Sequence, residues 1–144
     1  MDPRVALLRE IADLNARLVR NCLDGVSPAQ WMERPCKEAA NMAFIAWHLL
    51  DARYYVISLL GGQRGNPFKD QLDAVTAIDQ AHALPGLVEF RLGWRDADES
   101  LAQAMMSARP GILAREAGHP FPVGDPRASA RSARTGSSGR RSRW

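Results

Sequence analysis

The sequence predicts an all-α protein, an up-down helical bundle. Three observations support this fold class. Apolar residues recur every three or four positions in three long segments, which is the spacing of one face of a helix. Residues that commonly begin and end helices stand at the boundaries of those segments. No stretch alternates apolar and polar residues over the length of a strand.

The first predicted helix begins at Pro3 and ends before Gly25. Asp2 is its N-cap candidate, and a proline is tolerated at the first helical position because the N–H there has no helical partner. Ser27 and Gln30 then have the spacing of a capping box, which predicts a short helical turn. The row of residues expected to face the core of the first helix is Leu7, Ile11, Leu14, Leu18 and Cys22.

The second predicted helix spans about residues 41–60. Asn41 is its N-cap candidate, and the pair Gly61–Gly62 ends it. We expect its inward face to carry His48, with Asp51 on the neighbouring turn. The apolar residues of the same face are Ile45, Ala52, Tyr55 and Leu59, and it is broadened by Leu49, Val56 and Leu60.

Residues 63–84 are polar and rich in turn-forming residues, with Asn66–Pro67 as the clearest break. A short helix is expected near Thr76. The third long helix is predicted over about residues 85–108, and Gly93 inside it indicates either a modest cost or a point of close packing. Its inner face is predicted to carry Phe90, Trp94, Ala97, Leu101 and Met105.

Charge is distributed unevenly along the chain. The formal net charge is +3, yet residues 1–126 hold 13 of the 19 basic residues and all 16 acidic ones, a charge of -3. Residues 127–144 hold six arginines and no Leu, Ile, Val, Met or Phe. Such a segment buries too little apolar surface to offset the entropy of ordering, so we predict an incomplete bundle over 1–126 and a disordered basic tail over 127–144. The tail lacks interleaved aromatic residues for base stacking, which disfavours nucleic acid as a partner.

The composition is typical of a small soluble globular protein. Hydrophobic residues make up 46% of the chain, and the mean hydropathy is -0.28. No segment has the roughly 20 apolar residues of a membrane-spanning helix, and charged residues interrupt the N-terminus, so we expect a cytoplasmic protein with no membrane partner. Two cysteines, Cys22 and Cys36, are too few for a disulfide framework, and Cys22 is expected in the core.

Few residues in this sequence point to catalytic chemistry. The chain has no glycine-rich phosphate-binding loop and no serine nucleophile elbow. His48 is the candidate site residue, because Asp51 at i+3 lies on the neighbouring helical turn and could share a metal with it or orient its ring. The alternative is a buried histidine satisfied by a partner, with Asp51 in a surface ion pair. His82, in the polar segment, is expected to be solvated.

Three stretches resemble parts of a known family. The run Asn41-Met42-Ala43-Phe44-Ile45-Ala46-Trp47-His48-Leu49-Leu50-Asp51-Ala52-Arg53, with Leu59-Leu60-Gly61 after it, resembles the second helix of the DinB-like superfamily. Residues 23–31 resemble that family's link from helix one, and residues 84–87 followed by Trp94 resemble the beginning of its third helix. The likeness covers about residues 5–126. It implies a small bacterial four-helix bundle of a superfamily described as metal-dependent hydrolases or thiol-dependent S-transferases.

The resemblance also implies a divalent metal, zinc or nickel, bound by three histidines, and a small-molecule substrate. His48 matches the histidine of the second helix. The other two belong to a His-x-x-x-His stretch of the fourth helix, which this chain lacks. Residues 119–126 look like the loop before that helix, and we give His119 in this loop no ligand role. The basic tail stands in place of the fourth helix, as a shifted reading frame in a GC-rich gene would produce.

Two main hypotheses of function therefore stay open, beside a third and weaker one, a nucleic-acid binder that acts through the tail. One is a DinB-like metal-dependent hydrolase or S-transferase, impaired because two of three metal histidines are missing, with weak or absent metal binding. The other is a non-enzymatic helical binding or interaction module. In either case three apolar stripes would leave a groove where a fourth helix belongs, so we expect residues 1–126 to be marginal as a monomer and to form a homodimer or aggregate.

Overall fold

The computed structural model describes residues 2–114 of the chain. The chain divides into two units, Met1–Leu113 and Ala114–Trp144, and only the first is described here. The predicted tail (127–144), the loop at 119–126 with His119, and the place of a fourth helix lie outside the described residues. Every regular element in the described part is a helix, which confirms the all-α class. No helix in this part is long and apolar enough to cross a membrane.

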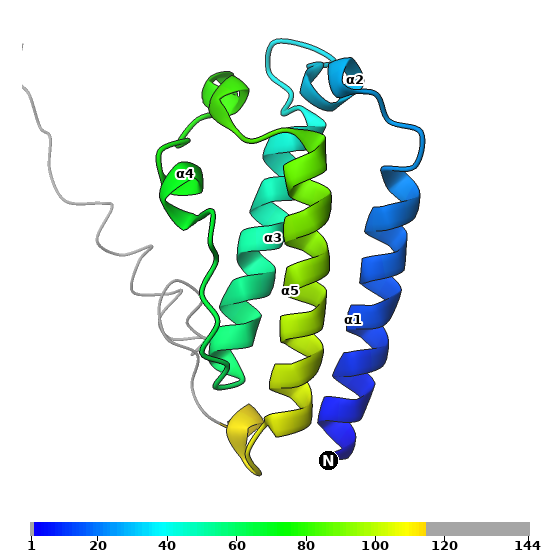
Figure 1. The fold of residues 1–144 in the computed structure, drawn as a ribbon, viewed down its shortest axis with the longest axis vertical. Helices are drawn as coiled ribbons and strands as arrows, with labels where there is room; N and C mark the ends of the chain where they lie inside the picture. The colour runs from blue at the N-terminus through cyan, green and yellow to red at the C-terminus, as the bar shows by residue number, and fades with distance from the viewer. Residues whose placement is uncertain (1, 115–144) are drawn as a thin grey trace, which may run out of the picture. The chain divides into compact units, whose positions relative to one another are not determined.

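Three long helices lie side by side and are joined by shorter ones (Figure 1). Helix α5 packs most extensively against α3 and less against α1. The elements are α1 (Pro3–Cys22), α2 (Pro28–Met32), α3 (Met42–Leu59), α4 (Lys69–Asp73), the 3₁₀ helix η1 (Ile78–Ala83), α5 (Leu87–Ser107) and the 3₁₀ helix η2 (Ile112–Ala114). The expected short helix near Thr76 is replaced by α4 before it and η1 after it.

The predicted helix boundaries are confirmed by their caps. The Asp2 carboxylate accepts a hydrogen bond from the backbone N–H two residues later (2.9 Å). The capping box forms, with the Ser27 hydroxyl accepting from the backbone N–H three residues on (3.2 Å). Asn41 caps α3 in the same way (2.8 Å). Beyond the ends of α1 and α3, Gly25 and Gly61 have φ values of 71° and 84°, which only glycine adopts readily.

Helices α3 and α5 run in the same direction, so the predicted up-down order is wrong for this pair. The beginning of α3 meets the beginning of α5, where the Trp47 indole N–H donates to the carbonyl of Pro85 (3.0 Å). The middle of α3 meets the middle of α5 through an ion pair between Arg53 and Asp98. Residues 60–86 carry the chain back along the bundle, as Figure 1 shows, and a connection of this length permits a parallel neighbour.

The core is centred on the inner face of α5, as predicted. All five residues expected there are buried: Phe90, Trp94, Ala97, Leu101 and Met105. The Phe90 ring lies 5.2 Å from the Trp31 ring and 5.4 Å from the Trp47 ring, between centroids. Gly93 is a point of close packing, because a Cβ there would lie 2.9 Å from the ring of Phe68. The aromatic cluster thus fixes α2 and α3 against α5.

Helix α3 turns a different face to the core than predicted. Its buried residues are Ala43, Ala46, Trp47, Leu50, Arg53, Tyr54 and Ile57. Of the predicted inward residues, Tyr55 is half-buried, and Ile45, His48, Ala52 and Leu59 are exposed. The physical reason is that α3 is apolar on most of its circumference, so the 3.6-residue period offers two apolar faces and does not select one.

Helix α1 also packs through another face. Its buried residues are Val5 and Ala16, with Ala12 and Val19 partly buried against the core. The predicted inward row is exposed throughout: Leu7, Ile11, Leu14, Leu18 and Cys22. Small alanines contact the core here, while the longer leucines, which carried the sequence signal, stay outside.

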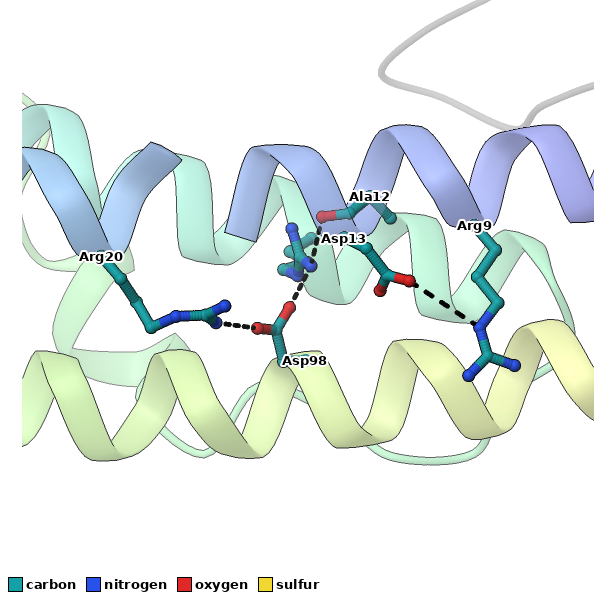
Figure 2. A network of polar contacts seen from close by, with 6 residues as sticks. Arg9, Ala12, Asp13, Arg20 and Asp98 are labelled. Atoms are coloured by element: carbon teal, nitrogen blue, oxygen red, sulfur yellow. Dashed lines mark hydrogen bonds and ion pairs between the residues drawn. The ribbon is translucent and has the colours of Figure 1, made fainter. Parts of the chain in front are cut away.

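A polar cluster ties α1 to the other two long helices (Figure 2). Arg53, whose side chain is 9% exposed, forms an ion pair with Asp98 and donates to the carbonyl of Ala12 (3.3 Å). Asp98 also accepts from Arg20 of α1 (3.1 Å). The Arg53 guanidinium lies 4.7 Å above the Trp94 ring. Burial lowers the pKa of Arg53, and the Asp98 carboxylate opposes that shift. The cluster therefore stabilises a buried cation with one carboxylate and one aromatic ring.

Candidate functional site

His48 lines a cavity beside α3 rather than the interior of the bundle. The cavity has a volume of about 240 Å³, and His48 is exposed at it, so the predicted inward orientation is wrong. Asp51 lines the same cavity, as expected from its i+3 spacing. The remaining lining residues are Phe44, Trp47, Leu72, Asp73, Val75, Thr76 and Leu84. We call this the His48 cavity.

The two carboxylates of the His48 cavity are already engaged by other side chains. Asp51 accepts from the amide of Asn66 (2.9 Å) and from the ammonium of Lys69 (3.3 Å). Lys69 also forms an ion pair with Asp73, and the hydrogen bond to Asp73 raises the pKa of the lysine, with Asp51 adding to the shift. The Lys69 ammonium thus already occupies the position beside these carboxylate oxygens that a metal ion would need.

The donor set of the His48 cavity does not fit a catalytic metal. Such a site needs about three protein ligands and one open position. In the described part of the chain, no group of three His, Cys, Asp or Glu side chains is placed to hold an ion. His48 supplies a single imidazole, and the nearby carboxylates are bound to Lys69.

A larger cavity lies between α1 and α5. Its volume is about 500 Å³, within the range of small-molecule sites. Its lining residues are Val19, Arg20, Leu23, Asp24, Phe90, Arg91, Trp94 and Arg95. Three guanidinium groups and one carboxylate give this lining a net charge of +2. We call it the arginine cavity.

The arginines of this cavity differ in their partners. Arg20 is paired with Asp98. Arg91 donates one N–H to the carbonyl of Leu23 (2.7 Å), the C-cap of α1, which leaves most of its five donors available. Among the described residues, neither Arg91 nor Arg95 has a carboxylate partner. The cavity therefore presents two guanidiniums without an ion-pair partner, together with the carboxylate of Asp24, beside an apolar lining.

The apolar part of the arginine cavity is formed by two stacked aromatic rings, Phe90 and Trp94. Trp94 is 5% exposed, and its indole N–H has no acceptor in the described part of the chain. The Phe90 and Trp94 rings are stacked, with centroids 5.7 Å apart. The N–H is enclosed by the protein, so Trp94 contributes its ring to the cavity and no hydrogen-bond donor.

A third polar cluster joins α3 to α5 and is fully paired. The Tyr54 hydroxyl donates to Asp96 (2.5 Å), and Arg64 donates to both oxygens of the same carboxylate (2.6 and 3.0 Å). Burial opposes ionisation of Asp96, but these hydrogen bonds outweigh it and lower the pKa of the carboxyl. Burial, reinforced by the hydrogen bond to Asp96, raises the pKa of Tyr54. This arrangement holds helices together and leaves no free group for a ligand.

The remaining predicted residues carry no site. Cys22 is exposed, so its expected place in the core is wrong, and Cys36 is exposed too. His82 is exposed, as predicted, and hydrogen-bonds through its ring to the carbonyl of Asp79 (3.1 Å). Trp31 is a buried packing residue, and Trp47 and Trp94 are also buried although each lines one of the two cavities.

Sequence reasoning missed the arginine cavity, although the sequence contains a signal for it. Phe90 and Trp94 are four residues apart, and so are Arg91 and Arg95, so a helix places an aromatic row beside a basic row. The signal does not show which helix covers those rows. Comparison of the chain with family models, with curated proteins and with solved structures gives no match, so the likeness to the DinB-like superfamily rests on the motifs quoted above.

Proposed function

We propose that this chain is a non-enzymatic helical binding module whose ligand is a small organic anion with an apolar body. The observation that carries the proposal is the arginine cavity. There the guanidiniums of Arg91 and Arg95, free of carboxylate partners in the described part, stand beside the buried rings of Phe90 and Trp94.

The chemistry of the cavity selects such a ligand. A carboxylate or sulfonate would pair with the two guanidiniums, since hydrogen bonds between ionised groups are stronger than neutral ones. The apolar body would lie against the aromatic rings and Val19 and Leu23. A cation would meet the guanidiniums of Arg91 and Arg95 against the single carboxylate of Asp24 and is disfavoured.

Decanoate and decanol provide the test, because they share a chain and differ in charge. We expect calorimetry to show that decanoate binds the full-length protein at least about tenfold more tightly than decanol, a difference of about 1.4 kcal/mol. Arg95→Gln should remove most of that preference. The matched control is Arg17→Gln, an exposed arginine of α1 outside the cavity.

The outcomes discriminate clearly. Equal binding of decanoate and decanol would show that any apolar surface of the protein suffices. Unchanged decanoate binding in Arg95→Gln would place the anion elsewhere. Equal losses in Arg95→Gln and Arg17→Gln would indicate general charge attraction, not the cavity. Each of these results would refute the proposal.

The second candidate is the metal-dependent hydrolase or thiol-dependent S-transferase that the resemblance implies. Its support is the position of His48 at a cavity. Because the described part offers one free ligand there, we propose weak binding of zinc or nickel, changed little by His48→Ala. Tight one-to-one binding in calorimetry that is lost in His48→Ala, but kept in His82→Ala, would instead favour the enzyme and locate further ligands outside residues 2–114.

A further inference from the structure

Ten large apolar side chains form an exposed face on α1 and α3. Each exposes between 38% and 59% of its surface, and none is charged. They are Leu7, Leu8, Ile11, Leu14 and Leu18 of α1, and Met42, Ile45, Leu49, Val56 and Leu59 of α3. We call these ten residues the apolar face.

The two rows of this face lie on the same side of the bundle. Arg53 of α3 donates to the carbonyl of Ala12, so these sides of α3 and α1 approach each other. Leu49 and Val56 lie one helical turn from Arg53, and Leu8 lies one turn from Ala12. None of the ten belongs to the buried residues of α1 and α3, which pack in the core against α5. Both rows are therefore left uncovered by α5.

We propose that a second copy of this chain covers the apolar face. A fully accessible leucine or isoleucine exposes roughly 150 Å², and each of the ten residues is about half exposed. Together they present on the order of 700 Å² of apolar surface. The largest apolar patch of a typical monomer is about 300–600 Å², whereas a stable interface buries about 800 Å² per partner. The face is thus large for a monomer and close to what a dimer needs.

A two-fold contact suits the composition of the face. In a symmetric dimer the same patch is used by both copies, so the α1 row of one would cover the α3 row of the other. The exposed Arg4, one helical turn from Leu7 and Leu8, is neutralised by its ion pair with Asp2, so it adds little repulsion when a patch meets its own copy.

The rest of the chain is a poor alternative occupant by composition. Residues 115–144 contain only three large apolar side chains, Phe121, Val123 and Trp144, along with seven arginines. Three such side chains are too few to exclude water from the ten side chains of the apolar face. The inference is independent of the proposed ligand, because no lining residue of the arginine cavity belongs to the apolar face.

Sedimentation of the full chain between about 1 and 100 µM tests the proposal. We expect a dimer at the upper concentrations. Leu14→Glu and Leu49→Glu, one in each row, should each weaken it at least about tenfold, because a carboxylate would be buried without a partner. The matched control is Leu92→Glu on α5, which is 53% exposed outside the face and should leave the dimer unchanged. Circular dichroism should report the same helix content for all three variants.

Other results would overturn the proposal in distinct ways. A monomer at every concentration would exclude a second copy, and a lower melting temperature of monomeric Leu14→Glu would then show that the chain covers its own face. A dimer dissociated equally by Leu92→Glu would use another surface. Growth into species larger than a dimer would show that the contact is not a two-fold one and continues from copy to copy.

Discussion

Removing the Asp98 carboxylate should destabilise the protein more than any exposed charge change. Asp98→Asn leaves Arg53 without its anion, and Arg53 is 9% exposed with an Nε–H that already lacks a partner among the described residues. Breaking a buried pair from one side costs about 3–5 kcal/mol. Asp98 is 20% exposed, and Arg53 keeps the Ala12 carbonyl and the Trp94 ring, so we expect about 2–3 kcal/mol.

Urea unfolding of the full chain, followed by circular dichroism at one fixed protein concentration, measures this cost. The control is Asp73→Asn, which breaks the exposed Lys69–Asp73 pair away from Arg53 and should cost less than about 0.5 kcal/mol. Melting temperatures should show the same order, at roughly 4–8 °C for each kcal/mol.

A double variant separates the buried charge from the lost contact. Arg53→Met with Asp98→Asn removes the cation together with its partner, so it should be more stable than Asp98→Asn alone. If Asp98→Asn costs no more than Asp73→Asn, or if the double variant is the less stable one, then the reasoning about an uncompensated buried cation is wrong.

Three further predictions concern single contacts. Asp96, whose carboxyl pKa is lowered from 3.8 by hydrogen bonds that outweigh burial, contributes stability that is present above about pH 4 and lost as the pH falls through its folded-state pKa. Tyr54→Phe should raise that pKa in a carboxyl NMR titration and move the loss of stability to higher pH. Gly93→Ala should cost about 1 kcal/mol in urea unfolding, because its Cβ would lie 2.9 Å from an aromatic ring, whereas Gly65→Ala, with open space around it, should change stability little. Asn41→Ala should cost about 2 kcal/mol in the same assay, because a buried cap and its second hydrogen bond are both lost.

Local chemistry explains what could be predicted from the sequence. Helix caps depend on one side chain and a backbone N–H two or three residues away, so Asp2, Ser27 and Asn41 could be identified without the fold. The inner face of α5 could also be predicted from the sequence. Its opposite side carries the charged Glu99, and the buried residues all fall on one stripe of the helix.

The orientation of α3 could not be predicted because its periodic signal is ambiguous. Leu50 and Ile57 lie on one apolar side of the helix and Ile45 and Leu49 on another, and only the neighbouring helices decide which is buried. The predicted inward orientation of His48 is wrong because His48 belongs to the side of α3 that stays exposed. The direction of α5 depends on the path of residues 60–86, which no local pattern specifies.

The arginine cavity illustrates a different limit. Its residues come from the C-terminal end of α1 and the first half of α5, which are about 70 positions apart in the chain, as the hydrogen bond from Arg91 to Leu23 shows. Hydrophobic periodicity indicates which face of each helix is buried. It does not show where the side chains of two packed helices leave space between them, and a cavity is such a space.

The polar cluster and the apolar face should be energetically coupled, because Arg53 lies on the border between the core and that face. A second copy over Leu49 and the α1 row would remove water from beside Arg53 and make its dependence on Asp98 stronger. We therefore expect Asp98→Asn to cost at least about 1 kcal/mol more in the dimeric chain than in the monomeric Leu14→Glu background. Urea unfolding of the four proteins of this cycle, at a concentration where the parent is dimeric, measures the difference. Strict additivity would show that the cluster is equally hydrated in both states and that the two features are independent.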